Sequence, residues 1–452
     1  MTRSARAAVT AHPENASTLS RASSAPFTVV HINTWDRIGG AARAALRLHE
    51  TLGALGYDSR MLVGFSAERP EERVRAVISE WPRWKRLLRR ATLGLERVSG
   101  MQDLLSWWSE EFLRHRFTQE ADIVHLHNTH GGYLSPAILP NLARRKPVVW
   151  SLHDQWALTG HCAFSLECER WKTGCGKCPR LSTYPALAVD TTSILWRMKR
   201  RLYRQSDMTL VVGSRWLAGL VNASPLLRDV PVSVIPCGID TSVFHPVPKA
   251  TARQALGIPR DVKVVLCVAE RMADVRKGTA FFLEALQRLK HLCQEPIWCL
   301  TIGDGLAAAP PFPHRHVNIV RDDRVLAGAF SAADVCVGPS LAESFGLVFA
   351  EAMACETPCV AFHLTALPEL IRHMETGYLA APADGADLAR GIQMVLTNDD
   401  LRRAMSRRGR ALIEQEYTAQ RSAQRHAALY GDVIRRFHAQ AIPHAQGRRQ
   451  PH

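Results

Sequence analysis

The chain has 452 residues, which is too long for one ordinary hydrophobic core, so two domains are expected. Its hydrophobic share of 46% and charged share of 22% are typical of a globular protein and argue against a disordered chain. No apolar run approaches the length of a membrane-spanning helix. The net charge of +15 favours an anionic partner, namely nucleic acid, a phosphate-bearing substrate or the face of an anionic membrane.

Residues 1–26 are rich in Ala, Ser and Arg and lack the apolar segment of a secretory signal. We expect a disordered extension there, although the composition also suits an organellar transit peptide. A second disordered tail is expected at 441–452. Without an export signal the expected compartment is the cytoplasm, where cysteines stay reduced.

From residue 27 onward, short β-branched runs alternate with helical patterns. In the first half the pattern predicts a helix at 41–56 and strands at 27–33, 59–64, 122–128, 147–154 and 208–214. A connector rich in Pro and Gly follows at 234–248, and the alternation then restarts. The second half is predicted to have helices at 278–292 and 346–355 and strands at 262–270, 297–305, 317–322, 334–340 and 358–363.

Strands that alternate with helices predict parallel sheets joined by crossover helices. The chain is therefore expected to be α/β, with Rossmann-like doubly wound domains at 27–236 and 237–416 and helices after residue 386. Ligands of open parallel sheets bind at the carboxyl ends of the strands. Two such domains that face each other would create a cleft lined by both sets of strand ends.

The segment PSLAESFGLVFAEAMA runs from a strand end into a helix. Glu343 lies in the connecting loop, residues 344–346 start the helix, and Glu351 follows about two turns later. A helix N-terminus offers free N–H groups and the positive end of its dipole, so a diphosphate could dock there with the carboxylates gripping hydroxyls beside it. The alternative is a Gly-softened helix start with Glu343 as a cap and Glu351 as a surface charge.

Upstream, AERMADVRKG places Arg271, Arg276 and Lys277 in a strand-to-helix loop just before Gly278. Cations at the carboxyl edge of a sheet suit a phosphate clamp. Such a loop can also be basic simply because it is exposed.

Taken together, VIPCGIDTSVFHP, ER-x5-KG, IGDG and PSLAESFGLVFAEAMACETPCVAF resemble the C-terminal half of retaining glycosyltransferases of family 4, which have the GT-B fold. In the first half, GGAARAA, DIVHLHN and SLHDQWALTGHCAFSLECERWKTGCGKCPRLSTYP are similar to a bacterial subgroup that builds exopolysaccharides and lipopolysaccharides. The resemblance spans roughly residues 29–417. It implies that the first domain binds the acceptor, that the second binds the nucleotide sugar, and that a helix at 417–440 crosses back to the first domain.

The resemblance also implies roles for individual residues. Glu351 would hold the ribose hydroxyls, and Glu343 would contact the donor sugar. Arg271 and Lys277 would neutralise the diphosphate, with Arg276 as an alternative to Arg271. The backbone N–H groups at the helix start would bind sugar and phosphate; these belong to Ser344, Phe345, Gly346 and Leu347.

In the first domain, Gly39 and Gly40 would let the first helix begin close to the diphosphate and the acceptor. His153 matches a family histidine that contacts the transferred sugar, although a histidine satisfied by the backbone at a strand end is the alternative. No DxD-type acidic pair follows a strand, so we expect transfer without a metal ion. The resemblance to family 4 implies that this transfer retains the anomeric configuration. Thr365 and Ala366 stand where the family favours glycines, and this departure leaves the donor sugar open.

Four of the eleven cysteines cluster with the spacing C-x5-C-x6-C-x2-C, and the final pair forms a knuckle-like C-G-K-C. This cluster predicts a structural Zn²⁺ site; reduced thiols and an iron–sulfur centre are the alternatives. Its members are Cys162, Cys168, Cys175 and Cys178. The other seven cysteines are expected to be buried thiols.

Two segments, 81–97 and 194–204, read as amphipathic helices rich in Arg, Lys, Trp and Leu. Each could lie on an anionic membrane or pack its apolar side inward. The resemblance implies a nucleotide-sugar donor and a glycan or lipid-linked acceptor as partners. The two helices add possible peripheral contact with the inner membrane face, and nucleic acid is not expected. The alternatives are a GT-B-fold nucleotide-sugar epimerase and a non-enzymatic zinc-knuckle protein that binds nucleic acid.

Overall fold

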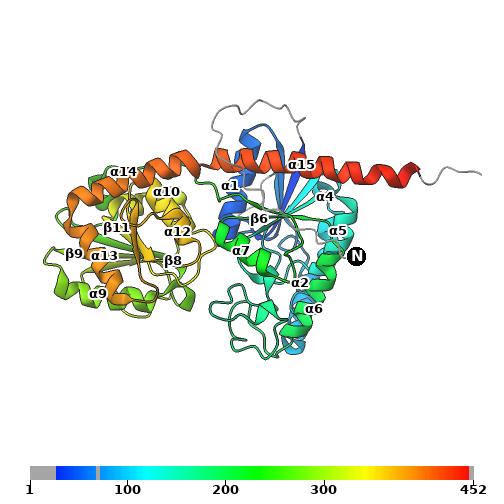
Figure 1. Cartoon of the computed structure of the whole chain (residues 1–452), viewed down its shortest axis with the longest axis horizontal. Helices are drawn as coiled ribbons and strands as arrows, with labels where there is room; N and C mark the ends of the chain where they lie inside the picture. Colours follow the sequence, from blue (N-terminus) through cyan, green and yellow to red (C-terminus); the bar gives the residue numbers. More distant parts are fainter. Residues whose placement is uncertain (1–26, 68–71, 447–452) are drawn as a thin grey trace, which may run out of the picture.

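The computed structural model describes residues 27–67 and 72–446, so the expectations for 1–26 and 447–452 lie outside the described part of the chain. The described residues form two lobes, each built around one sheet (Figure 1). The strand pairings within both sheets are parallel. This confirms the predicted α/β class with two doubly wound units.

The first sheet has seven strands in the order β3-β2-β1-β4-β5-β6-β7. They are β1 (Thr28–Trp35), β2 (Asp58–Phe65), β3 (Val74–Ala76), β4 (Ile123–Leu126), β5 (Val148–Leu152), β6 (Thr209–Val212) and β7 (Val232–Val234). The strand order changes direction between β1 and β4, which is the position where such sheets bind ligands. The sequence pattern did not predict β3 and β7, because these short edge strands carry no run of apolar residues.

The second sheet has six strands in the order β10-β9-β8-β11-β12-β13 and changes direction between β8 and β11. They are β8 (Lys263–Arg271), β9 (Ile297–Asp304), β10 (His314–Val317), β11 (Val335–Gly338), β12 (Cys359–Phe362) and β13 (Gly377–Ala380). The strand predicted at 317–322 is observed earlier in the chain, as β10 at His314–Val317. The edge strand β10 is largely exposed, so its pairing does not follow the apolar residues that come after it.

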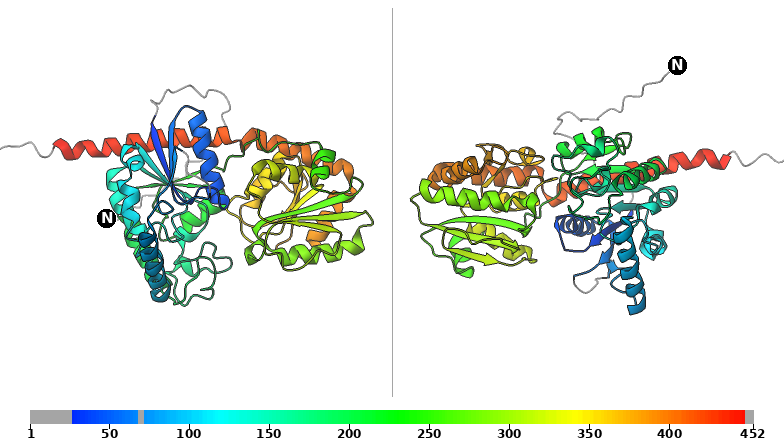
Figure 2. Two further views of the ribbon diagram at one scale, coloured as in Figure 1. Left: turned by 180° about the vertical axis from the view of Figure 1, so that it is seen from behind. Right: turned by 90° about the horizontal axis from the view of Figure 1, so that it is seen from below.

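Helices cover both faces of each sheet (Figure 2). In the first domain they are α1 (Gly40–Ala54), α2 (Arg83–Ser99), α3 (Ser109–Arg114), α4 (Arg116–Glu120), α5 (Leu139–Arg145), α6 (Thr192–Arg204) and α7 (Arg215–Ala223). In the second they are α8 (Lys249–Ala255), α9 (Thr279–Leu292), α10 (Asp323–Ala332), α11 (Leu347–Ala354), α12 (Leu367–Leu370), α13 (Gly385–Thr397) and α14 (Asp399–Glu416). None of the helices in the described residues is long and apolar enough to cross a bilayer.

The last helix, α15 (Ala419–Gln446), belongs to the first domain by packing although it follows the second in sequence (Figure 1). Its Ala427 and Tyr430 are buried in one apolar cluster with Leu48 and Leu52 of α1 and Val29 of β1. α15 extends to Gln446 and so includes residues 441–446 of the expected tail.

Candidate active site

Three helices that begin where the domains meet have a glycine at the N-cap position. The N-caps are Gly39 for α1, Gly278 for α9 and Gly346 for α11, with φ values of 89°, 66° and 98°. No side chain caps any of these three helix starts. In contrast, Asp384 and Asn398 cap α13 and α14 with their side chains. The three starts therefore leave backbone N–H groups for a ligand.

The starts of α1 and α11 face each other across the domain boundary. A Cβ atom added to Gly40 would lie 3.6 Å from Leu347 Cδ1, and one added to Gly39 would lie 3.8 Å from Glu270 Oε2. Behind them, Ser214 donates a hydrogen bond to the backbone oxygen of Ser344 at 2.7 Å. The structure thus brings the predicted glycines of the first domain to the predicted helix start of the second.

Lys277 and Arg276 lie close to the Glu343 carboxylate beside the start of α11. Lys277 Nζ lies 2.6 Å from Glu343 Oε1, and Arg276 Nη1 lies 4.0 Å from Oε2. Burial alone would raise the pKa of Glu343, but these two cations outweigh it and hold the pKa below its ordinary value. The Glu343 side chain is only 14% exposed, so the three charges form a compact, partly desolvated group.

Arg271 is exposed at the end of β8. The Arg276 guanidinium lies 4.6 Å from the centre of the Phe164 ring of the first domain. Arg276 thus lies close to Glu343, and the roles of both arginines at the diphosphate stay predictions.

Glu351 is fully buried, which excludes the reading of this residue as a surface charge. Its Oε1 accepts hydrogen bonds from Arg43 and Arg47 of α1, each at 3.1 Å. Both arginines also contact Asp323, at the start of α10, at 2.7 and 3.2 Å. The second carboxylate oxygen, Oε2, is buried and has no hydrogen-bond partner. One acceptor atom of Glu351 is therefore buried and unpaired.

Sequence reasoning missed Arg43, Arg47 and Asp323. Burial would lower the pKa of Arg43, but the charges of Glu351 and Asp323 outweigh it and raise the pKa. The four-residue spacing of the arginines, which puts them on one helix face, was the available signal. Nothing in the sequence indicated that this face meets the other domain.

Thr365 adopts φ 54°, the left-handed region that favours glycine, and its Oγ1 accepts a hydrogen bond from Glu343 N at 3.0 Å. The departure from glycine therefore keeps the backbone shape and adds a contact that holds the Glu343 loop.

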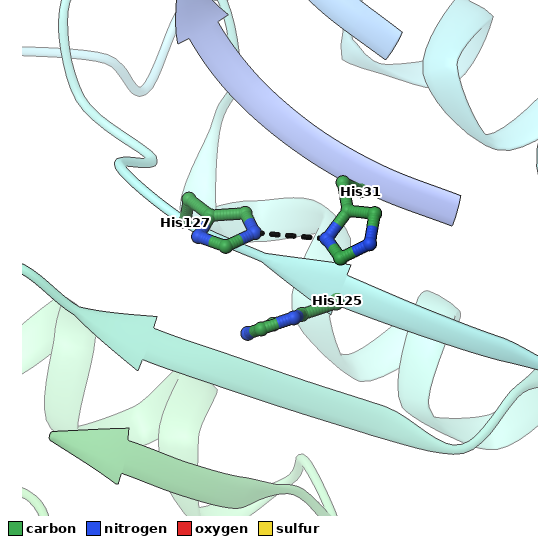
Figure 3. A group of neighbouring side chains, drawn as sticks. All are labelled: His31, His125 and His127. Atoms are coloured by element: carbon green, nitrogen blue, oxygen red, sulfur yellow. Dashed lines mark hydrogen bonds between the residues drawn. The ribbon is translucent and has the colours of Figure 1, made fainter. Parts of the chain in front are cut away.

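His153 lies at the end of β5 in a pocket whose lining includes Arg47, His127, Gly213 and His426. Its Nε2 is 3.0 Å from His127 Nδ1, and His127 Nε2 is 3.1 Å from His31 Nδ1. Figure 3 shows the second of these contacts. Burial lowers the pKa of His153 to about 4, so its ring is neutral near pH 7. A histidine satisfied only by the backbone is excluded, because the partner is another side chain.

The four clustered cysteines all line one pocket in the loops after β5. Within the described residues, however, no three of their sulfur atoms lie within 4.8 Å of one another, whereas His31, His125 and His127 have ligand nitrogens that meet this spacing. Cys178 instead contacts His161 Nε2 at 3.4 Å, and Cys175 accepts a hydrogen bond from Gly160 N. This arrangement of thiols does not fit a bound ion as it stands, and the zinc site stays a prediction.

Six of the other seven cysteines are buried as expected, while Cys237 is only partly buried and lines the pocket beside His153.

The two amphipathic helices differ in what they expose. In α6, Leu195, Trp196 and Tyr203 are buried, so this helix packs its apolar side inward. In α2, Trp84 is 63% exposed and Leu87 is 66% exposed. Only α2 keeps the combination of apolar and cationic surface that the membrane reading requires.

Two Rossmann-like domains with parallel sheets, uncapped helix starts that face each other and a C-terminal helix that returns to the first domain define the GT-B class of fold. The structure is similar to sucrose-phosphate synthase from Thermosynechococcus elongatus, with a TM-score of 0.65 at 21% identity over 90% of this chain and 99% of the other. It is also similar to HepE from Anabaena in complex with UDP-glucose, with a TM-score of 0.60 at 17% identity over 90% and 100%.

Family models agree with the fold. Residues 38–243 match the model described as Glycosyltransferase Family 4, and residues 262–398 match Glycosyl transferases group 1. The chain is therefore a glycosyltransferase of the family 4 type.

Two relatives show how far the sequence similarity extends. A protein named for colanic acid biosynthesis, the glycosyl transferase WcaC of Escherichia coli K12, is 27% identical over 74% of this chain and 82% of its own length. N-acetyl-alpha-D-glucosaminyl L-malate synthase of Bacillus anthracis is 32% identical, over 44% of this chain and about half (52%) of its own length.

Proposed function

We propose that this glycosyltransferase moves a hexose-type sugar from a nucleoside diphosphate sugar to a glycan or lipid-linked acceptor in cell-surface polysaccharide biosynthesis. The observation that carries the proposal is the pairing of Lys277 and Arg276 with Glu343 directly beside the uncapped start of α11. The name of WcaC and the UDP-glucose bound to HepE support the class of pathway and of donor.

In the proposed reaction the bond between the anomeric carbon and the diphosphate oxygen breaks, and the leaving diphosphate takes the electron pair. Lys277, Arg276 and the helix N–H groups stabilise that negative charge as it develops. The acceptor oxygen bonds to the anomeric carbon on the face that the diphosphate leaves, and its proton passes to a phosphate oxygen. The configuration is therefore retained, and the cations of the chain take the role that a metal ion has in other transferases.

Glu351 is proposed to bind the ribose of the donor. Its unpaired Oε2 has a free acceptor position for a ribose hydroxyl, while Arg43 and Arg47 bind Oε1 and compensate the charge of the carboxylate. His153 and the glycines Gly39 and Gly40 belong to the first domain, across the boundary from Glu351. They are proposed to contact the transferred sugar and the acceptor.

The test is a screen of UDP- and GDP-sugars in which the release of nucleoside diphosphate is measured for wild type, Glu351→Gln and Lys277→Met. Wild type should release one of the two diphosphates, and Lys277→Met should lower kcat by roughly 100-fold or more, the range found when one charge-stabilising donor is removed. Lys290→Met, an exposed position on α9, is the matched control and should keep the wild-type rate.

Equal rates in wild type and both site variants would remove the proposed function. Conversion of the donor sugar without release of diphosphate would instead indicate an epimerase. Thermal stabilisation by oligonucleotides but not by nucleotide sugars would indicate a nucleic-acid-binding protein.

We further propose that α2 rests on an anionic membrane. Its exposed apolar side chains include Trp84, Leu87 and Val98, and exposed arginines flank them at positions 83, 86, 90 and 97. Apolar side chains that enter the headgroup region together with cations that pair with lipid phosphates are the features of an interfacial helix.

Sedimentation with liposomes tests this surface. The wild-type protein should pellet with vesicles that contain anionic lipid and stay in solution with neutral vesicles. The variant Trp84→Ser/Leu87→Ser should lose most of this binding, whereas Leu292→Ser, an exposed leucine of the second domain, should not. Equal binding by both variants, or self-association through α2 without lipid binding, would contradict the proposal.

A further inference from the structure

Histidines occupy one face of the first sheet in an unbroken group beneath the candidate site. His31 of β1 pairs in register with His125 of β4, and side chains two residues apart lie on the same face. His127 therefore follows His125 on that face, and all three side chains are at most 2% exposed. Figure 3 shows that the three rings come from neighbouring strands and lie close together.

Two of these rings, those of His31 and His127, are joined end to end with the ring of His153. His31 Nδ1 contacts His127 Nε2 at 3.1 Å, and His127 Nδ1 contacts His153 Nε2 at 3.0 Å. The ring centres of each pair are 5.3 Å apart, with interplanar angles of 30° and 19°. The result is a hydrogen-bonded row that begins in the core at β1 and ends at the site residue His153.

The row consists of neutral rings. Burial lowers the pKa of His31 and His127 well below the ordinary value, and it lowers that of His153 to about 4. A neutral imidazole has one N–H and one acceptor nitrogen. The two hydrogen bonds of the row must therefore run in the same direction, either toward His153 or away from it.

The inner end of the row decides between these directions. His31 Nε2 is buried and has no hydrogen-bond partner. If each ring donated its hydrogen bond toward His31, the Nε2 of His31 would carry an N–H without an acceptor. If each ring donated toward His153, the same nitrogen would carry only an unpaired acceptor position. Buried N–H groups without an acceptor are rarer than buried acceptors without a donor. The bonds therefore run from His31 toward His153, whose Nε2 accepts.

A metal ion is a poorer occupant of this group. Although His31, His125 and His127 have suitable spacing, both ring nitrogens of His125 are already used. Its Nε2 contacts Ser151 Oγ at 2.7 Å, and its Nδ1 contacts the Tyr430 hydroxyl at 2.5 Å. The cluster also contains no carboxylate to offset the charge of an ion, and Arg47 lies in the adjoining pocket.

We propose that His127 and His31 are positioning residues that hold His153 in the Nδ1–H tautomer, so that it donates a hydrogen bond to an oxygen of the sugar or acceptor and does not act as a base. The proposal rests on the proposed function for the role of His153. The tautomer itself follows from the row and can be measured without any substrate.

The experiment is ¹⁵N NMR of histidine-labelled protein, in which the two ring nitrogens of His153 report its tautomer. Wild type should show His153 protonated at Nδ1. His127→Leu removes the N–H group that His153 Nε2 accepts from, so it should shift His153 toward the Nε2–H tautomer. His127→Gln again offers an N–H donor beside His153 Nε2 and should restore the Nδ1–H tautomer. His31→Leu removes the donor to His127, so the His127–His153 hydrogen bond can run in either direction. This variant should therefore show a mixture of the two tautomers of His153.

His125→Leu is the matched control, because His125 is equally buried on the same face but does not bond to His153. In kinetic assays His127→Leu should lower kcat by roughly 10- to 100-fold, by analogy with the range found for residues that orient metal-ligating histidines, with a donor KM within about threefold of wild type. His125→Leu should change kcat much less, and His127→Gln should recover part of the loss.

Protonation of wild-type His153 at Nε2, an unchanged tautomer in His127→Leu, or a metal ion that copurifies and is lost in His31→Leu would each overturn the proposal. If wild type releases no diphosphate from any nucleotide sugar, the proposed function fails, while the tautomer result still decides the present inference.

Discussion

At the scale of single residues, the site depends on carboxylates that are buried and compensated by cations. Glu343 and Glu351 both lie in segments that the sequence singled out, but their partners differ in origin. Lys277 and Arg276 come from the same domain and were predicted, whereas Arg43 and Arg47 come from the other domain and were not. A carboxylate removed from water is stable only where such partners remain.

The lowered pKa of Glu343 predicts a pH-dependent contribution to stability. Its pKa in the folded protein lies below the ordinary value of 4.5, so the unfolded chain binds the proton more readily. The contribution should be fully present above pH 4.5 and lost as the pH falls through the folded pKa. The difference in melting temperature between wild type and Glu343→Gln should therefore shrink below pH 4.5, and a constant difference from pH 7 to 3 would contradict this account.

At the scale of elements, glycines determine how closely loops approach the start of α11. Gly278 has φ 66°, and a Cβ atom there would lie 1.9 Å from Pro339 O, which is far inside contact distance. This approach places Lys277 next to the loop that carries Glu343. The short 3₁₀ turn Val275–Lys277 and the glycine thus position the cation before any ligand binds.

Gly278→Ala should therefore destabilise the second domain by about 2–3 kcal/mol or more, since both the backbone angle and the contact oppose a side chain. Gly328→Ala is the control, because Gly328 lies in α10 with open space around it. That change should be neutral or stabilise by about 0.5–1 kcal/mol. Thermal unfolding measures both effects, and equal melting temperatures for the two variants would show that the close approach is not needed.

At the scale of the whole molecule, the domains are joined by several contacts, of which two involve the last helix and α1. The chain passes from α14 of the second domain into α15, which packs on the first. The arginines of α1 bridge to Glu351 and Asp323 on the other side of the boundary. Because the donor is proposed to bind at this boundary, the same arginines that join the domains would also order the site.

Arg43→Met/Arg47→Met should loosen this arrangement. The change leaves Glu351 buried without its cations, a loss of about 3–5 kcal/mol for a broken buried ion pair. We expect a lower melting temperature and a larger radius of gyration in small-angle X-ray scattering. Arg425→Met, which breaks an exposed 3.6 Å pair with Glu416, is the control and should change neither quantity. An unchanged radius of gyration in the double variant would show that other contacts suffice to hold the domains together.

The sequence by itself determined the fold class and most strands, because alternation of apolar strands and amphipathic helices is a local pattern. It also predicted Glu343, Lys277 and the helix start at Gly346, since they follow one another along strand-loop-helix units. The short edge strands and the exposed β10 escaped prediction because their pairing partners, not their own residues, place them in the sheet.

Only the tertiary structure decided which side chains meet between distant segments. The bridge from Arg43 and Arg47 to Glu351 and the row from His31 to His153 join segments more than 90 residues apart. The same holds for the different fates of α2 and α6, whose compositions are alike. Burial and partner choice depend on what covers a surface after folding, and a local pattern carries no information about that.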